Sequence, residues 1–305
     1  MSTVLSIKLR FSCLVLVACG IAPWAAGQKT YLTAADLVAR PSPPADKRIH
    51  YGDGALQFGD LRLPEGEGPY PVAIVVHGGC WLAQYDIHHI GPFAKALTDE
   101  GIATWTIEYR RAGDEGGGWP ATFLDVAAGT DYLRKLAEVY PLDLDRTIAV
   151  GHSAGGHFVL WLAGRHLIPK RSPLYIDNPL RLRGVLALSA APDLARIHRS
   201  GSCDGAMDTI MGGSPVEVPE HYRNGSPIEM LPLGVPRILI TGRHDRPMRR
   251  IEAIEAYAAK AAKLDDNARL VFAPESAHFE VIAPDSSTWP MVRDAAFELL
   301  GVTRE

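Results

Sequence analysis

Short apolar runs alternate with segments of helical periodicity along most of this chain, and this alternation constrains the fold more than any other feature. The run at 70–76 is apolar throughout, as is typical of a strand that is covered on both faces. Such strands, separated by helical segments, predict βαβ units and a mainly parallel sheet in an α/β fold. The expected strands are 55–63, 70–76, 102–109, 147–151, 182–188, 236–241 and 268–273, and the expected helices are 121–140, 154–164, one around 251–258 and one over 289–299.

The chain departs from this pattern at two places. Residues 28–54 are polar and rich in proline, so we interpret them as an N-terminal segment that leads into a main domain over residues 55–305. Between residues 191 and 234, glycine, proline, serine and methionine are mixed in short pieces. This stretch predicts a small cap insertion, and we expect it to influence the choice of substrate.

Residues 1–27 have the features of an export signal that is removed from the mature protein. Two basic residues precede an apolar stretch at 11–19, and small residues follow at 25–27. The apolar stretch is far shorter than the ~20 residues of a membrane-spanning helix. Residues 16–19, LVAC, also resemble a bacterial lipobox, in which Cys19 carries a lipid and begins the mature chain. Both kinds of signal stay open: each predicts a periplasmic or secreted protein, and only lipidation of Cys19 would hold it at a membrane.

Charge and motif content exclude several classes of function. The 31 basic and 35 acidic residues give a net charge of −4, and no basic run of five residues occurs, which argues against nucleic acid as the partner. Residues 114–120 contain three consecutive glycines but lack the lysine and Ser/Thr of a phosphate loop, so nucleotide binding is not expected there. The sequence does not define an oligomeric state.

Of the four cysteines, only Cys80 and Cys203 lie outside the expected export signal. Two cysteines cannot form a tetrahedral cysteine site, and no HExxH or CxxC spacing is present, so we expect no catalytic metal. An oxidising compartment permits a disulfide between the two cysteines, but the sequence does not supply the geometry that it needs. The disulfide therefore stays open.

The segment GHSAG at 151–155 fits the pattern G-x-S-x-G and lies between an expected strand and an expected helix. A serine exposed at a sharp strand-to-helix turn brings its neighbours close together. The flanking positions must then be almost free of side chains, and Gly151, Gly155 and Gly156 meet this need. The first turn of the helix adds free N–H groups and the positive end of the helix dipole. The sequence therefore predicts Ser153 as a nucleophile.

A second glycine-rich segment, HGGCW at 77–81, directly follows the apolar run at 70–76. Glycines allow backbone N–H groups to turn inward, as an oxyanion hole requires. An HGGG-type loop often accompanies a G-x-S-x-G serine, and Cys80 in place of the third glycine keeps the backbone donor. We predict that the N–H group of Ala154 and that of Gly79 or Cys80 bind the oxyanion.

A nucleophilic serine needs a base and an acid that orients the base, and in proteins with this motif the chain order is Ser, acid, His. Asp245 and His278 each follow a late strand, so both leave the carboxyl end of the sheet, where loops converge on Ser153. This order predicts Asp245 as the acid and His278 as the base. Asp193, which also follows a strand, is the rival acid.

Other side chains near these motifs have weaker claims. His152 adjoins the serine on the sharp turn and should point elsewhere, and His157 lies on the following helix and should face the core or the sheet, so we expect both to pack in the interior. Trp81, Tyr109 and Trp119 either line a substrate pocket or pack beside the loops, and the sequence supports both alternatives equally.

Three motifs together carry a resemblance to a known family. HGGCW at 77–81, EYRRAGDEGGGWP at 108–120 and GHSAGGH at 151–157 resemble the α/β-hydrolase superfamily over about residues 55–300. They are similar to its esterase and lipase branch, which includes kynurenine formamidases and bifunctional feruloyl/acetyl-xylan esterases. The resemblance implies a mostly parallel central sheet flanked by helices, and it implies no cofactor.

The resemblance also implies a serine hydrolase in which Ser153, Asp245 and His278 cleave a small carboxylic ester, or an amide, through an acyl-enzyme. One alternative is an arylformamidase, which the export signal disfavours because N-formylkynurenine is a cytoplasmic metabolite. A prolyl-oligopeptidase is disfavoured because the chain has no room for the propeller. An alternative of another class is a catalytically silent binding protein, although no member of the triad is missing.

Overall fold

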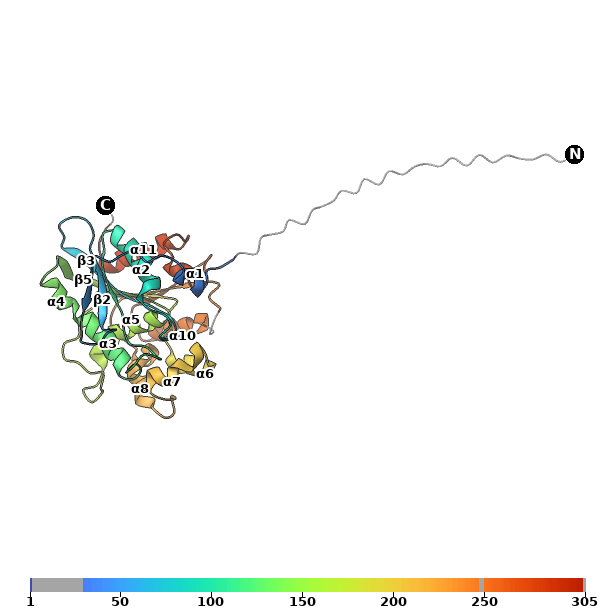
Figure 1. The fold of residues 1–305 in the computed structure, drawn as a ribbon. Helices are drawn as coiled ribbons and strands as arrows, with labels where there is room; N and C mark the ends of the chain where they lie inside the picture. The colour runs from blue at the N-terminus through green and yellow to red at the C-terminus, as the bar shows by residue number, and fades with distance from the viewer. Residues whose placement is uncertain (2–29, 247–249, 304–305) are drawn as a thin grey trace. The chain divides into compact units, whose positions relative to one another are not determined.

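An eight-stranded sheet lies at the centre of the structure (Figure 1), counted over the residues that the computed structural model describes, 1, 30–246 and 250–303. The strand order is β1-β2-β4-β3-β5-β6-β7-β8. The pairs β1–β2 and β2–β4 are antiparallel, and the other pairs are parallel. The predicted α/β fold with a mostly parallel sheet is therefore confirmed. The strands are β1 (Lys47–His50), β2 (Phe58–Arg62), β3 (Tyr70–Val76), β4 (Ala103–Ile107), β5 (Leu142–His152), β6 (Gly184–Leu188), β7 (Arg237–Gly242) and β8 (Ala268–Ala273).

The apolar pattern located the strands with buried or continuous apolar runs best. β3 and β8 begin and end where the sequence predicts. β5 begins at Leu142 instead of residue 147. Its first half is polar and irregular, since Pro71 pairs with Asp143 whereas the next residue, Val72, pairs with Thr147, so the apolar pattern begins only in the second half of the strand. β1 was not expected: this edge strand is largely exposed, so its residues show no alternation of apolar and polar side chains.

Helices cover both faces of the sheet (Figure 1). Residues 72, 74 and 76 of β3 belong to one apolar cluster, with side chains of α3, α5 and α10, whereas residues 73 and 75 belong to a second cluster with α2 and α11. Successive strand residues thus point to opposite faces, and both faces are buried. The α-helices are α1 (Ala34–Val38), α2 (Gly91–Asp99), α3 (Ala121–Asp131), α4 (Leu133–Ala137), α5 (Ala154–Gly164), α6 (Leu194–Ser200), α7 (Ala206–Met211), α8 (Pro219–Gly225), α9 (Pro227–Met230), α10 (Arg250–Lys263) and α11 (Trp289–Leu300). Short 3₁₀ helices are η1 (Ile87–Ile90), η2 (Arg165–Leu167), η3 (Cys203–Gly205) and η5 (Glu280–Ile282).

The helices differ from expectation in two respects. The helix expected over 121–140 is divided at Tyr132 into α3 and α4, whereas α5 has the predicted bounds. α2 was not expected, although it is amphipathic and buries Phe93 and Leu97 against the sheet.

The two segments that depart from the regular pattern are both structured. The segment at 191–234 lies between β6 and β7 and contains α6 to α9. The N-terminal segment contributes α1, and it also contributes β1 to the sheet. Most of the expected export signal, with Cys19, lies outside the described residues. No helix in the described part of the chain is long and apolar enough to span a membrane.

Candidate active site

Ser153 occupies a sharp turn between β5 and α5. Its φ of 55° and ψ of −113° lie outside the conformations that ordinary side-chain-bearing residues prefer. Glycines make this turn possible: a Cβ atom at Gly155 would lie 2.0 Å from the carbonyl oxygen of Val76, and one at Gly151 would lie 2.3 Å from that of Gly155. The strand-to-helix turn that the G-x-S-x-G motif predicts is therefore present.

Asp245 and His278 follow β7 and β8 and meet at the same end of the sheet. The Nδ1 atom of His278 lies 3.0 Å from Oδ2 of Asp245, and this carboxylate is completely buried. Nδ1 therefore donates its proton to Asp245, which leaves Nε2 available as a base. The structure thus brings the expected acid and base together.

The charges around this pair keep the acid ionised. Burial by itself raises the pKa of Asp245. The charge and hydrogen bond of His278 and the nearby Arg250 guanidinium lower this pKa by more than burial raises it, so the pKa of Asp245 lies below its usual value. The Nε atom of Arg250 lies 3.8 Å from Oδ1 of Asp245. Burial, together with the charge of Arg250, lowers the pKa of His278 despite the opposing effect of Asp245. His278 is therefore a neutral base at pH 7.

Ser153 and His278 line a common cavity of about 220 Å³. Its wall also includes Gly79 and Cys80, so the expected nucleophile, base and oxyanion loop all face one space. Most of the remaining lining is apolar or aromatic. The full lining is Ala34, Leu37, Val38, Gly79, Cys80, Tyr85, His89, His152, Ser153, Arg250, His278 and Phe279.

The loop after β3 has an unusual backbone. Gly79, Cys80 and Trp81 all have positive φ, at 111°, 55° and 56°. At Gly79 a Cβ atom would lie 2.3 Å from that of Tyr85, so this position requires glycine. Ala154 is the first residue of α5, where backbone N–H groups have no acceptor within the helix. The loop and the helix end thus supply the candidate oxyanion donors.

Cys80 of this loop forms a disulfide with Cys203 of η3 in the insertion. The Cα atoms are 5.2 Å apart, a usual separation for a disulfide. The sequence left this bond open, and the structure places it beside the cavity, since Cys80 is part of the lining.

The three aromatic residues for which the sequence left both a pocket role and a packing role open lie outside the cavity. Trp81 and Tyr109 are almost fully buried: the Trp81 Nε1 donates to His157 Nδ1 at 3.3 Å, and the Tyr109 hydroxyl donates to the carbonyl of His77 at 2.9 Å. Trp119 stacks on His221 at a centroid separation of 4.2 Å. None of the three aromatic residues lines the cavity of Ser153. The aromatic side chains that do so are Tyr85 and Phe279, which the sequence did not single out.

The rival acid and the neighbouring histidines have structural partners. Asp193 caps α6, where its carboxylate accepts from the N–H of Arg196 at 2.9 Å. His152 is buried, and its Nε2 donates to the carbonyl of His278 at 2.9 Å. His157 donates from Nε2 to the carbonyl of Gly225 at 2.8 Å, and burial lowers its pKa to about 4. His157 packs in the interior, whereas His152 is buried and also lines the cavity.

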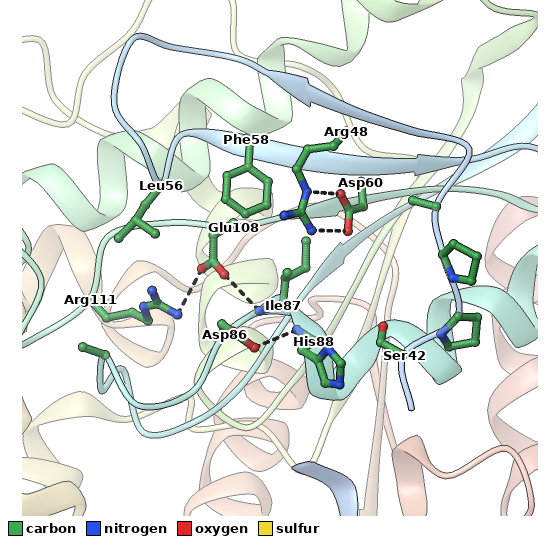
Figure 2. Close-up of a pocket in the computed structure, with 14 residues that line it drawn as sticks. Ser42, Arg48, Leu56, Phe58, Asp60, Asp86, Ile87, His88, Glu108 and Arg111 are labelled. Carbon is green, nitrogen blue, oxygen red and sulfur yellow. Dashed lines mark hydrogen bonds and ion pairs between the residues drawn. The ribbon is translucent and has the colours of Figure 1, made fainter. Parts of the chain in front are cut away.

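A second cavity, of about 480 Å³, lies beside β1 and β2 (Figure 2). In it Arg48 forms a two-bond ion pair with Asp60, at 2.8 and 3.0 Å. Its lining includes neither Ser153 nor His278, so it is separate from the candidate active site. The loop at 83–89 contributes to both walls: Tyr85 and His89 face the first cavity, and Ala83, Asp86, Ile87 and His88 face the second.

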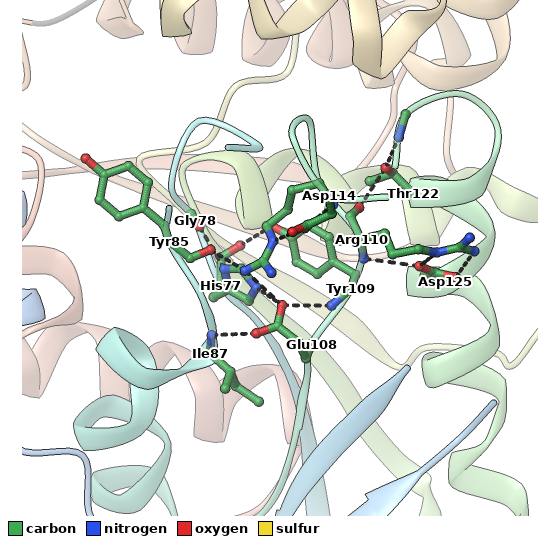
Figure 3. A network of polar contacts seen from close by, with 12 residues as sticks. His77, Gly78, Tyr85, Ile87, Glu108, Tyr109, Arg110, Asp114, Thr122 and Asp125 are labelled. Atoms are coloured by element: carbon green, nitrogen blue, oxygen red, sulfur yellow. Dashed lines mark hydrogen bonds and ion pairs between the residues drawn. The ribbon is translucent and has the colours of Figure 1, made fainter. Parts of the chain in front are cut away.

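Glu108 connects this loop to the base of the oxyanion loop (Figure 3). Its buried carboxylate lies 2.9 Å from His77 Nε2, accepts from the N–H of Ile87 at 3.0 Å and pairs with Arg111 at 3.2 Å. His77 is the first residue of HGGCW, so Glu108 holds both ends of the segment 77–87. The sequence did not single out Glu108, because a carboxylate after a strand has no local feature that reveals its partners.

The BD-FAE family model matches residues 60–257, which include Ser153 and Asp245 but not His278. No curated protein matches this chain in sequence. Among solved structures, esterase B of Lactobacillus rhamnosis inhibited by a tributyrin phosphonate has a TM-score of 0.72 and 16% identity, over 85% of this chain and 87% of that chain.

Two carbohydrate-active proteins are also similar in fold. An acetyl ester-xyloside bifunctional hydrolase of Caldicellulosiruptor lactoaceticus has a TM-score of 0.66 and 21% identity, over 85% of this chain and 98% of that chain. A bifunctional GH43-CE protein of Bacteroides eggerthii has a TM-score of 0.67 and 21% identity, over 82% of this chain, which spans only 37% of that protein. At these identities the structures show the α/β-hydrolase fold, and the family match covers more than half of the sequence. The chain therefore belongs to the BD-FAE family, of the α/β-hydrolase type.

Proposed function

We propose that this chain is a serine esterase that cleaves carboxylic esters through an acyl-enzyme. The observation that carries the proposal is the hydrogen bond from His278 to the buried Asp245, beside a cavity that His278 shares with Ser153. Membership of the BD-FAE family supports the same activity. So does the likeness to esterase B of Lactobacillus rhamnosis, which was solved with a phosphonate inhibitor.

The first half of the reaction acylates the serine. Nε2 of His278 takes the hydroxyl proton of Ser153 as Oγ attacks the ester carbonyl carbon, and the carbonyl electron pair moves onto oxygen. Asp245 stabilises the imidazolium that forms. The tetrahedral intermediate then expels the alcohol oxygen, which takes the proton from Nε2 and leaves as an alcohol.

The second half of the reaction restores the serine. Water gives a proton to Nε2 of His278 as its oxygen attacks the acyl carbon, and Ser153 leaves with that proton while the carboxylic acid is released. In both halves the negative oxygen accepts hydrogen bonds from the N–H of Ala154 and from that of Gly79 or Cys80. Removal of one such donor costs about 3 kcal/mol of transition-state stabilisation in related enzymes.

We also propose that the protein is exported and that residues 1–27 are its signal. The disulfide between Cys80 and Cys203 supports an oxidising compartment. The protein would meet its ester substrate outside the cytoplasm.

A comparison of rates tests the proposed function. The purified mature protein is assayed with p-nitrophenyl acetate, methyl ferulate, acetylated xylan and N-formylkynurenine. Ser153→Ala serves as the blank, and Ser214→Ala, at a serine outside the cavity, serves as the matched control. We expect ester turnover that Ser153→Ala abolishes and Ser214→Ala retains. Dominant turnover of N-formylkynurenine would instead identify an arylformamidase, and full activity of Ser153→Ala would contradict the proposed mechanism.

A further inference from the structure

The N-terminal side of the substrate cavity is formed by a short segment that precedes the family match. We call residues 31–40, which include α1, the N-terminal strap. Three of its residues, Ala34, Leu37 and Val38, line the cavity that contains Ser153. The family model begins only at residue 60, so this wall is an addition to the part of the chain that the family model describes.

The strap is tied to the loop that carries the base. Glu280 accepts from the N–H of Leu32 at 2.5 Å with one oxygen and from the N–H of Ala277 at 2.9 Å with the other. The same carboxylate therefore connects the strap to the residue before His278. At its other end, Arg40 forms two hydrogen bonds with Asp285, at 2.7 and 3.2 Å.

The strap also contacts the loop that carries the acid. The ring of Tyr31 stacks on that of His244, next to Asp245, with centroids 5.2 Å apart. Thr33 caps α1 through a capping box with Asp36, which fixes the start of the helix. Strap, acid loop and base loop thus form one connected unit, and α1 is held in place over the cavity.

The side chains that the strap presents to the cavity are apolar. Leu37 is 2% exposed and belongs to the core, whereas Val38 is 49% exposed and reaches both the cavity and the solvent. A cavity of about 220 Å³ is smaller than the ~300–1,000 Å³ of usual small-molecule sites, so it accepts one part of a substrate. Val38 lies at the solvent-accessible end of this wall, so it is the residue that a longer acyl chain of the substrate would contact.

We propose that the N-terminal strap is the specificity-determining wall of this active site, and that Val38 limits the length of the apolar acyl group that the enzyme accepts. This inference rests on the proposed esterase function. An acyl chain that extends past Val38 leaves its end in water, whereas a short chain is enclosed between α1, Tyr85 and Phe279.

The test compares kcat/KM for p-nitrophenyl acetate, butyrate and octanoate in variants of the full chain. Val38→Phe narrows the cavity, and Val38→Ala widens it. The control, Val139→Phe, introduces the same valine-to-phenylalanine substitution at a residue that is 75% exposed and lies outside the cavity. We expect Val38→Phe to lower the ratio of octanoate to acetate about tenfold. Val38→Ala should raise this ratio, and Val139→Phe should leave it unchanged.

The Ser153→Ala variant separates the two proposals. If it is inactive while both Val38 variants keep the parental ratio, the role of the strap is overturned and the esterase stands. If it retains activity on p-nitrophenyl acetate, the esterase proposal and the strap proposal both fail. Because Val38 is half exposed, its variants should keep the parental thermal unfolding midpoint, and that measurement accompanies the rates.

Discussion

The disulfide between Cys80 and Cys203 joins the oxyanion loop to the insertion across 123 residues of sequence. It therefore closes a very long loop in the unfolded chain, and it holds one wall of the cavity against the segment that contains α6 to α9.

Removal of this disulfide should lower stability strongly. We expect the double variant Cys80→Ser/Cys203→Ser to lose about 4–5 kcal/mol of unfolding free energy, since cross-linking a loop of this length restricts the unfolded state most. Guanidinium unfolding of the two proteins, without reductant, measures the difference. Equal midpoints would show that the bond contributes nothing, and a reductant should affect only the parental protein.

The two aspartates that follow strands should behave differently. Asp245→Asn should lower kcat about 10⁴-fold, because the amide NH2 group donates to Nδ1 and the imidazole then adopts the wrong tautomer. Asp193→Asn, at the cap of α6, should keep kcat and change stability by no more than about 1 kcal/mol. The kcat values of both variants on p-nitrophenyl acetate test this prediction. A larger loss of kcat in Asp193→Asn than in Asp245→Asn would identify Asp193 as the catalytic acid instead.

The pH dependence should reflect the lowered pKa of His278. Because burial and Arg250 disfavour its protonated form, the neutral base persists below pH 6.5, and kcat/KM should reach its plateau before pH 7. Arg250→Gln removes the nearby positive charge, so the acidic limb should move to higher pH. A pH profile of kcat/KM for both proteins tests this. An acidic limb above pH 7 in the parental enzyme would be inconsistent with the environment of His278.

Glu108 should act as a positioning residue for the oxyanion loop. In Glu108→Gln, His77 and Arg111 lose their carboxylate partner, so the loop is held less firmly, and kcat should fall about 10²-fold with little change in KM. Asp60→Asn, in the Arg48 ion pair of the second cavity, is the matched control and should retain kcat. A change confined to KM, or an equal loss in the control, would remove Glu108 from this role.

Local patterns predicted much of the fold and part of the site. The apolar run of β3 and the glycines around Ser153 act over a few residues, and so their structural consequences follow from the sequence alone. Edge strand β1 and helix α2 were missed: β1 has no buried face, whereas α2 is amphipathic and its pattern was overlooked.

Contacts between distant residues were harder to predict. Both Asp193 and Asp245 follow strands, and only their contacts distinguish them. Asp245 accepts from His278, whereas Asp193 accepts from the backbone N–H of Arg196 at the start of α6. For Trp81 the sequence supported a pocket role and an interior role equally, and the structure buries its ring, with a hydrogen bond to His157.

The sequence by itself determined the parallel sheet, the turn at Ser153 and the chain order of the proposed triad, because these depend on periodicity and on the spacing of small residues. Only the tertiary structure decided the Cys80–Cys203 disulfide, the role of Glu108 and the wall formed by the N-terminal strap. Each of these joins segments that are distant in the chain. Their meeting depends on how the loops pack at the end of the sheet, and no local pattern records that packing.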